Sequence, residues 1–249
     1  MSTAAPHVDR QGARVRPEGS PSVKMTWSTL AFLHWTFDPT RVQALLPDGL
    51  EIDTFEGNAY VGIVPFTMTG VRHAKCPPVP GTHSFHELNV RTYVTCDGVP
   101  GVWFFSLDAA SRLAVRVARM TYSLPYYSAT MSLQNTGKRV KYTSRRAHRG
   151  AEPALFSCVW EIGDELPPSE ADSLDYFLTE RYCLYAHRKG ALWRGRIFHE
   201  PWRLRNARLD TGTLQSSMLD ACGLSEQADE PVVRYAESID TEAWALERV

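Results

Sequence analysis

Cysteine is scarce in this sequence, and its placement argues against a disulfide framework. Five cysteines stand among 249 residues, and no two of them form a CxxC pair. An odd and scattered set is typical of reduced thiols in a protein of the cytosol. The sequence therefore predicts a cytoplasmic protein.

Long apolar runs are also absent. No stretch approaches the roughly 20 apolar residues that a membrane helix needs, and the first residues lack the apolar centre of a signal peptide. Residues 1–22 are rich in Pro, Gly, Ser and Arg, which predicts a disordered N-terminal tail. The rest shows no repeat and no linker, so we expect one domain over residues 23–249 and no membrane partner.

Motifs for the common cofactors are missing. The sequence holds no GxGxxG or GxxxxGK[ST] phosphate loop, no HExxH zinc motif and no GxSxG nucleophile turn. The histidines that were considered as metal ligands are not spaced as a known site: His73, His83, His86, His187 and His199. We therefore predict neither a cofactor nor a bound metal.

Charge of one sign does not dominate, since 27 Lys and Arg face 28 Asp and Glu. Two stretches are nevertheless basic: residues 138–149, and residues 187–208 with Trp193 and Trp202 among the arginines. Aromatic rings between cations can bind single-stranded nucleic acid, but two solvated strand faces have the same composition. Because the chain has no excess positive charge, we expect a small organic anion as partner before nucleic acid.

The sequence is rich in strand-like segments. Alternating or apolar runs cover residues 27–37, 50–66, 85–94, 102–107, 126–133, 138–146, 155–162 and 183–204, the second of them as a hairpin. Helical spacing covers residues 38–47, 108–120 and 167–182, with Asp38 and Asp108 as N-caps of the first two. This pattern predicts an α+β, strand-rich fold, an antiparallel barrel or curled sheet with a few flanking helices.

The strand predicted over residues 85–94 has a polar face. Period-two alternation places Glu87, Asn89, Arg91 and Tyr93 on one side. If that side faces solvent, the strand is an ordinary exposed one. If it lines the interior, these groups must be paired, because an isolated buried charge is very costly. A glutamate and an arginine in a mostly apolar cavity are typical of a small-molecule site.

A second candidate segment follows the helix predicted over residues 108–120. Leu124 and Pro125 end that helical stretch, and Tyr126 and Tyr127 open the next strand. Neighbouring residues of a strand point to opposite sides, so one phenol can enter the interior while the other packs outside. The alternative is that both tyrosines simply fill the interior with hydrogen-bonded hydroxyls.

Other polar residues have structural interpretations. Glu180 and Arg181 end the helix predicted over residues 167–182, where they can close a cavity or, as we prefer, form an ion pair at the helix end. His34 and His199 flank apolar strands and are expected to be packed, hydrogen-bonded histidines. We interpret Asp108 first as a helix cap.

Taken in order, several segments resemble the YqjF-like family of uncharacterised proteins (DUF2071), which is grouped with the acetoacetate decarboxylase-like superfamily. The similarity runs from about Trp27 to the end of the chain and is carried by HW, LPDGLEIDTF, FHELNVRTYV, PGVWFFSLDA, LPYY, FLTERYCLY and HEPW. The resemblance implies a closed, mostly antiparallel β-barrel with flanking helices and a central cavity.

A weaker resemblance to acetoacetate decarboxylase itself concerns the chemistry. The segment 85–88 resembles its Y-x-E-L strand, which implies that Glu87 lies in the active site. The segment 118–127 resembles its G-R-E-L-x-x-x-P-K-K segment, with Arg119 and Pro125 at the same separation.

The lysines of that enzyme are not present in this segment. Tyr126 and Tyr127 stand in their places, and a phenol cannot form the Schiff base of that reaction. The arginine that the resemblance implies upstream falls near Ser28. We therefore expect no acetoacetate decarboxylation by the family's mechanism.

These observations lead to two hypotheses about one pocket. The first is an enzyme that acts on a small oxo- or hydroxy-carboxylate by acid–base chemistry. Its candidate catalytic residues are Glu87, Tyr126 and Tyr127, and its candidate substrate-binding residues are Arg91, Arg119, Asn89 and Tyr93. The second is a non-catalytic binder or sensor of a small organic anion. A homo-oligomer is compatible with both.

Overall fold

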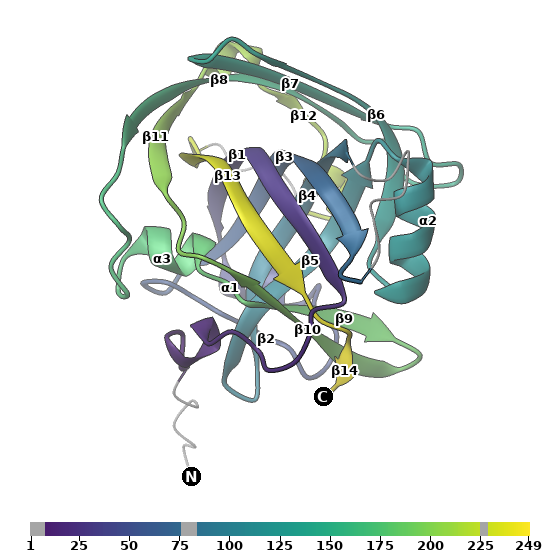
Figure 1. Ribbon diagram of the computed structural model, residues 1–249. Helices are drawn as coiled ribbons and strands as arrows, with labels where there is room; N and C mark the ends of the chain where they lie inside the picture. The colour runs from purple at the N-terminus through teal and green to yellow at the C-terminus, as the bar shows by residue number, and fades with distance from the viewer. Residues whose placement is uncertain (1–7, 76–83, 225–228) are drawn as a thin grey trace.

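One large β-sheet dominates the protein. The computed structural model describes residues 8–75, 84–224 and 229–249, and fourteen strands join into a single sheet (Figure 1). The described part of the chain contains no helix that is long and apolar enough to cross a membrane. The expected α+β fold rich in strands is confirmed.

Up to residue 199 the elements follow the order that the sequence pattern indicated, and the elements after residue 209 were not predicted. The strands are β1 Val23–Phe37, β2 Glu51–Ile52, β3 Ala59–His73, β4 Ser84–Cys96, β5 Val99–Ala109, β6 Tyr126–Asn135, β7 Arg139–Arg146, β8 Leu155–Glu165, β9 Cys183–Arg188, β10 Ala191–His199, β11 Leu204–Leu209, β12 Gln215–Ser216, β13 Val232–Ala243 and β14 Glu247–Arg248. The α-helices are α1 Pro39–Gln43, α2 Arg112–Thr121 and α3 Leu174–Thr179, and three short 3₁₀ turns are η1 Gly12–Arg14, η2 Thr211–Thr213 and η3 Asp220–Cys222.

The sheet curls so that strands far apart in its order also pair with one another. The neighbours run β14-β10-β9-β5-β6-β7-β8-β11-β13-β1-β3-β4-β2, with β12 on β8, and β4 also pairs with β5 while β10 pairs with β13. In Figure 1, β6, β7 and β8 arch over the top of the central strands β1, β3, β4 and β5, and β9 and β10 lie below them. Most pairs are antiparallel, but β5 has two parallel partners, β6 and β9.

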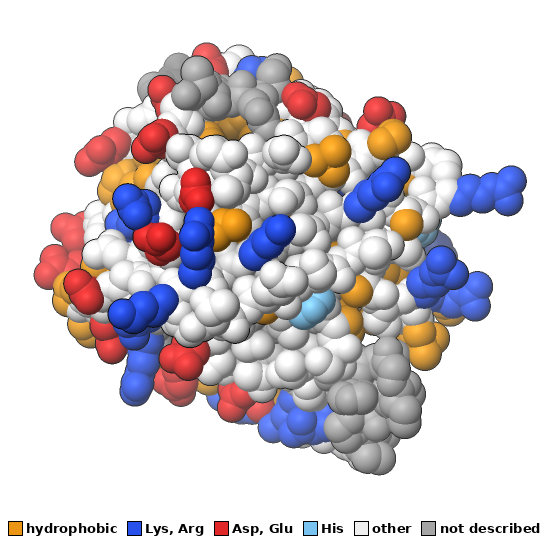
Figure 2. Space-filling model, turned by 90° about the horizontal axis from the view of Figure 1, so that it is seen from above, with side chains coloured by type: hydrophobic (Ala, Val, Ile, Leu, Met, Phe, Trp, Pro, Cys, Tyr) orange, Lys and Arg blue, Asp and Glu red, His pale blue; other side chains and the backbone are white. Residues whose placement is uncertain are grey.

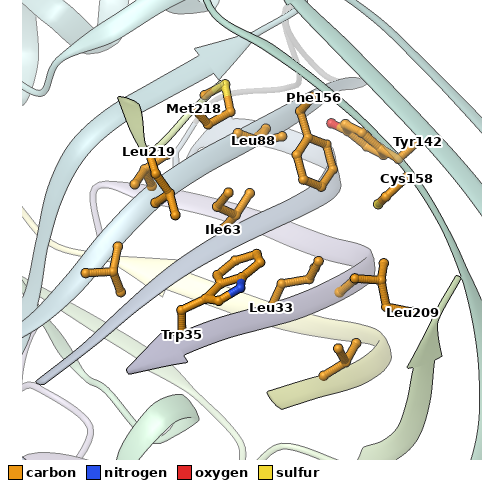
Figure 3. Close-up of a cluster of buried hydrophobic side chains, with 14 of the residues drawn as sticks. Leu33, Trp35, Ile63, Leu88, Tyr142, Phe156, Cys158, Leu209, Met218 and Leu219 are labelled. Atoms are coloured by element: carbon orange, nitrogen blue, oxygen red, sulfur yellow. The ribbon is translucent and has the colours of Figure 1, made fainter. Parts of the chain in front are cut away.

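The larger apolar cluster fills the space under the arch. Figure 3 shows Leu33, Ile63 and Leu88 of β1, β3 and β4 on one side and Phe156 and its neighbours of the arching strands on the other. All of these side chains are buried. Burial of this much apolar surface holds the arch against the central strands.

Helix α2 differs from the sequence prediction at its start and in its exposed face. Ser111, not Asp108, is the N-cap, because Asp108 belongs to β5 and the Ser111 hydroxyl accepts a hydrogen bond from the Ala114 amide. Val115 is the buried residue of the helix. The helical spacing of Leu113, Ala114, Val117 and Met120 predicts one apolar stripe toward the core, but three of these side chains are exposed: Leu113 at 48%, Val117 at 49% and Met120 at 71%.

Two further elements are shorter than predicted. Helix α3 starts after its N-cap Ser173 and stops at Thr179, because the next residue, Glu180, has non-helical backbone angles. The hairpin predicted over residues 50–66 does not form, since β2 pairs with β4 instead of β3. The tight turn there has positive φ at both Glu56 and Gly57 and leaves only an isolated bridge.

The segment before β1 contacts the sheet. Arg10 forms an ion pair with Asp53, and Arg16 forms one with Glu242 of β13. Residues 1–7 of the predicted tail lie outside the described residues. The cysteines Cys96, Cys158, Cys183 and Cys222 are free thiols, as expected, and Cys76 also lies outside the described residues.

Candidate functional site

The structure brings Glu87 of β4 together with Tyr126 of β6. The Tyr126 hydroxyl donates a hydrogen bond of 3.0 Å to Glu87 Oε2, and both side chains are buried. The strand register explains the meeting, because paired residues share a side of the sheet. Glu87 pairs with Ala109 of β5, and Leu107, two residues earlier on that side, pairs with Tyr126.

The surroundings of Glu87 favour its neutral form. Burial raises the pKa of Glu87 to about 8, and the charge of nearby Asp108 raises it as well, while the hydrogen bond from Tyr126 acts in the opposite direction. Within the described part of the chain, Glu87 forms no ion pair with an arginine or lysine. A carboxyl group whose pKa lies near neutral pH can both give and take a proton.

The backbone at Glu87 is hydrogen-bonded to a side chain of strand β7. The Tyr142 hydroxyl of β7 donates to the Glu87 carbonyl oxygen across 2.8 Å. The same hydroxyl lies 3.3 Å from the carbonyl oxygen of Phe66. Tyr142 therefore connects β7 to the two central strands that carry this side of the site.

The polar face predicted on β4 points into the protein. Glu87 and Asn89 are 2% and 5% exposed, so the alternative of an ordinary solvent-facing strand is excluded. The Asn89 Oδ1 and Arg91 Nε atoms are buried and have no hydrogen-bond partner among the described residues. Arg91 is anchored at its other end, where Nη2 donates to the Leu178 carbonyl oxygen at 3.1 Å and the guanidinium lies over the Phe32 ring. Among the described residues, an acceptor and a donor without partners, Asn89 Oδ1 and Arg91 Nε, thus follow Glu87 along one strand.

Tyr93 is the last residue of this polar face, and its hydroxyl has two hydrogen-bond partners. Its hydroxyl donates to the Leu178 carbonyl oxygen at 2.7 Å and lies 2.6 Å from His34 Nε2. Because the one hydroxyl hydrogen is used toward Leu178, His34 must donate from Nε2. Burial and the charge of Arg91 hold the pKa of His34 well below its ordinary value, so this imidazole is neutral. The expectation that His34 is a packed, hydrogen-bonded residue is confirmed.

Tyr127 lies on the other side of the sheet. The Arg146 guanidinium covers its ring at 4.1 Å, and the His148 ring meets it edge-on. The structure therefore joins Tyr126, and not Tyr127, to Glu87. Arg119 reaches this region through the backbone, since its Nη1 donates to the Tyr126 carbonyl oxygen at 2.7 Å.

Asp108 and Arg146 form a buried ion pair that the sequence did not reveal. The carboxylate is fully buried and accepts from Arg146 Nε at 3.0 Å and from Nη2 at 2.8 Å. The interpretation of Asp108 as a helix cap is wrong, because the strand β5 continues to Ala109. Arg146 lies on β7, 38 residues away, and nothing in the local pattern connects the two.

Glu180 and Arg181 do not pair with each other, contrary to the preferred interpretation. Arg181 Nη1 binds Asp53 Oδ2 at 2.7 Å, while Glu180 accepts hydrogen bonds from the Tyr182 hydroxyl and from the Trp202 amide. The non-helical backbone at Glu180 turns the two side chains toward different partners. Both are buried and hold the end of α3 in place.

Several aromatic residues that sequence reasoning missed lie near Arg91. Phe32, under the Arg91 guanidinium, meets Trp202 edge-on at 5.1 Å, and Trp202 in turn stacks with Trp27 at 6.2 Å. Trp27 Nε1 is buried without a partner among the described residues. His199 packs against this group and its Nδ1 bonds to the Glu200 carbonyl oxygen, as expected for a packed histidine.

In the described ranges no three His, Cys, Asp or Glu side chains are grouped as ion ligands. His83, one of the histidines considered, lies outside those ranges.

Comparison with known proteins identifies the relatives of this chain. The DUF2071 family, described as an uncharacterized conserved protein, matches residues 24–240. The uncharacterized protein YqjF of Bacillus subtilis (strain 168) is 38% identical over 232 residues, which cover 93% of this chain and 94% of that protein.

Solved structures share the fold at low sequence identity. The enduracididine biosynthesis enzyme MppR complexed with pyruvate has a TM-score of 0.63 at 12% identity, covering 92% of this chain and 91% of that one. An acetoacetate decarboxylase-like enzyme from Sphingomonas wittichii RW1 has a TM-score of 0.61 at 14% identity, covering 93% and 94%. The fold is thus that of acetoacetate decarboxylase-like proteins, and the sequence match shows that this chain belongs to the DUF2071 family.

Proposed function

We propose that this protein is a small-molecule enzyme that moves a proton on a small oxo- or hydroxy-carboxylate, inside a sheet that closes as a barrel. The observation that carries the proposal is the buried hydrogen bond between the Tyr126 hydroxyl and the Glu87 carboxyl group. In the described part of the chain no arginine or lysine forms an ion pair with this carboxyl group. The pair therefore holds a proton between two groups whose pKa values are set by their surroundings. Arg91, with its unpartnered Nε on the same strand face, is the group that would bind the substrate carboxylate.

The chemistry that fits this pair is removal of a proton next to a carbonyl group. Glu87 in its ionised form takes the proton from carbon, the C–H electron pair forms a carbon–carbon double bond, and the carbonyl π electrons move to oxygen. Once Glu87 carries that proton, the Tyr126 hydroxyl turns its single hydrogen from Glu87 to that oxygen and stabilises its negative charge. A base with a pKa near neutral pH is stronger than an ordinary glutamate and is still partly ionised at that pH.

The relatives support a test with 2-oxo-carboxylates. One protein with the same fold was solved with pyruvate, and again with the condensation product of pyruvate and imidazole 4-carboxaldehyde. Those ligands belong to that protein, at 12% identity. They make pyruvate and its longer homologues the first compounds to try here, because each has an acidic C–H beside a carbonyl group.

The test is hydrogen exchange followed by proton NMR. Pyruvate and other 2-oxo-carboxylates are incubated with the protein in deuterated buffer, and loss of the C3 proton signal is followed over time. We expect exchange with the wild type, and loss of about 10²–10⁴-fold in rate in Glu87→Gln. Tyr127→Phe is the matched control for Tyr126→Phe, because it removes a neighbouring hydroxyl on the other side of the sheet. Equal rates in the wild type and Glu87→Gln would contradict the assignment.

A non-catalytic binder is the second candidate, and a specific observation favours it. Asn89 Oδ1 and Arg91 Nε are buried and unpartnered, as expected of groups that wait for a polar ligand. Under this function the same carboxylates raise the midpoint of thermal unfolding but never lose their C3 protons. Arg91→Met would then abolish the thermal shift, while Glu87→Gln would leave it in place.

A further inference from the structure

A cavity of about 430 Å³ lies where strand β5 changes partners. On one edge, β5 pairs in parallel with β9 at Val102 and Trp103, and with β6 from Leu107 onward. Among the described residues no strand pairs with this edge between Trp103 and Leu107. The two parallel neighbours therefore diverge, and we call the space between them the fork cavity.

The walls of the fork cavity are mostly apolar and aromatic. Trp103, Phe104 and Phe105 line it from β5, Tyr185 lines it from β9, and Leu124 lines it from the segment before β6. Its volume falls in the range of roughly 300–1,000 Å³ that is usual for small-molecule sites. A flat apolar group of a ligand would lie against these rings and leave water.

One cation stands at the edge of this apolar space. Arg119, in the last turn of α2, lines the cavity and is exposed. Its Nη1 is fixed by the Tyr126 carbonyl oxygen, and it forms no ion pair with a carboxylate in the part of the chain that the structure describes. The remaining N–H groups of an oriented guanidinium match the two oxygens of a carboxylate.

The position of Arg119 at the end of α2 also limits the negative charge of an anion that can bind in the cavity. Helix α2 ends at Thr121, so the carbonyl end of the helix, with its partial negative charge, borders the cavity. A multiply charged anion such as phosphate is disfavoured there. A single carboxylate bound to Arg119 fits better.

The backbone at the cavity wall is strained. Ser123, which lines the cavity, has a φ of 53°, although it is not a glycine. A residue other than glycine is uncommon in this left-handed region and persists there only where the surroundings enforce it. The left-handed backbone at Ser123 turns the chain after α2 ends, so that Leu124 and Pro125 lie along the cavity.

From these features we infer a ligand site: the fork cavity binds a monocarboxylate with an aromatic or similarly flat apolar body, and Arg119 holds the carboxylate. Glu87, Asn89 and Arg91 are not among the residues that line this cavity. Its occupation does not depend on proton transfer at Glu87.

The test is isothermal titration calorimetry with benzoate and phenylacetate, and with benzyl alcohol as the uncharged analogue. We expect both carboxylates to bind the wild type and the alcohol to bind more weakly. Arg119→Gln should weaken benzoate binding by about ten- to a hundredfold, the usual worth of a charged hydrogen-bonded pair. Arg116→Gln, which removes an equal charge from the exposed side of the same helix, should leave the affinity within about twofold.

A second variant keeps the test independent of the contact between Arg119 and Tyr126. Leu45 lines the cavity and is 39% exposed, so Leu45→Glu places a negative charge there without disturbing the core. It should weaken benzoate and leave benzyl alcohol nearly unchanged. Equal affinity of wild type and Arg119→Gln for benzoate, or no saturable binding of benzoate at millimolar concentration, overturns the proposal. Unchanged benzoate binding in Glu87→Gln separates this site from the proposed catalytic pair.

Discussion

The Tyr126 hydroxyl lies 3.0 Å from Glu87 Oε2, although 39 residues separate the two in the chain. The meeting requires β4 and β6 to lie on opposite edges of β5 in a fixed register. Both side chains are buried and burial raises the pKa of each, so their shared proton is held in a place where neither group ionises easily.

The first prediction concerns the pH dependence of stability. The pKa of Glu87 is raised from 4.5 to about 8 in the folded protein, so the folded state binds this proton more tightly than the unfolded state. The stabilising effect is complete below pH 4.5 and is lost as the pH rises toward 8, at no more than about 1.4 kcal/mol per pH unit. Glu87→Gln should therefore gain stability relative to the wild type across this window. Urea unfolding at several pH values measures the difference in unfolding free energy between Glu87→Gln and the wild type. A difference that does not change with pH would contradict the prediction.

Tyr126→Phe should affect both stability and titration. The change removes the hydroxyl that stabilises the ionised form of Glu87, so the pKa of Glu87 should rise further. It also leaves a buried carboxyl group with one fewer partner, which costs about 1–3 kcal/mol of unfolding free energy. Carbon-13 NMR of the labelled glutamate side chains follows the titration. Tyr127→Phe should shift neither quantity at Glu87, and an unchanged pKa in Tyr126→Phe would argue against the hydrogen bond.

The buried ion pair between Asp108 and Arg146 should carry a large structural effect. Arg146→Met leaves the fully buried Asp108 carboxylate without its cation, and loss of one partner of such a pair costs about 3–5 kcal/mol. Arg208 is the matched control, because its ion pair with Glu161 is exposed, with 83% of the arginine side chain accessible. Arg208→Met should leave the urea midpoint unchanged. Equal midpoints for the two variants would show that burial does not matter here.

His34 should limit stability on the acid side. Burial holds the pKa of His34 well below 6.5, so the folded protein binds this proton less tightly than the unfolded chain. This unfavourable effect is absent well above pH 6.5, and stability is lost as the pH falls below it. His34→Gln retains a donor for Tyr93 and should make stability less sensitive to acid between pH 6.5 and pH 5. The unfolding midpoints at these two values, compared with those of the wild type, test this.

The charged surface bears on the nucleic-acid alternative. Figure 2 shows Lys and Arg side chains in separate groups, mixed with Asp and Glu on the left of this face, and no positive area that runs across it. Several arginines of the two basic stretches are in ion pairs with acids: Arg139 with Asp210, Arg194 with Glu247 and Arg208 with Glu161. If nucleic acid binds, affinity must fall steeply with salt. A filter-binding series at rising salt concentration tests this.

Local patterns were sufficient to predict most strands up to residue 204 and the polar face, but not β12, β13 and β14. Alternation along residues 85–94 depends only on the two-residue period of a strand, and Glu87, Asn89 and Tyr93 do share the buried side. The break at Pro125 is equally local, because proline cannot continue a helix. The resemblance of these segments to a known family indicated the fold.

The predictions that failed depend on contacts between distant residues. Asp108 followed by a helical pattern is typical of an N-cap, but the pairing of β5 with β4 extends to Ala109 and takes Asp108 into the sheet. The apolar residues Leu113, Val117 and Met120 have helical spacing, yet the helix packs through Val115 instead. Amphipathic spacing predicts a helix but does not specify which side finds a partner.

The sequence by itself determined that Tyr126 and Tyr127 point to opposite sides of one strand, because neighbouring side chains of a strand alternate. Which of them meets Glu87 was decided only by the tertiary structure. The register places Leu107 beside Tyr126 and Asp108 beside Tyr127, and a shift of one residue would exchange the two tyrosines. Register depends on how strands β4, β5 and β6 pack together, and no short segment contains that information.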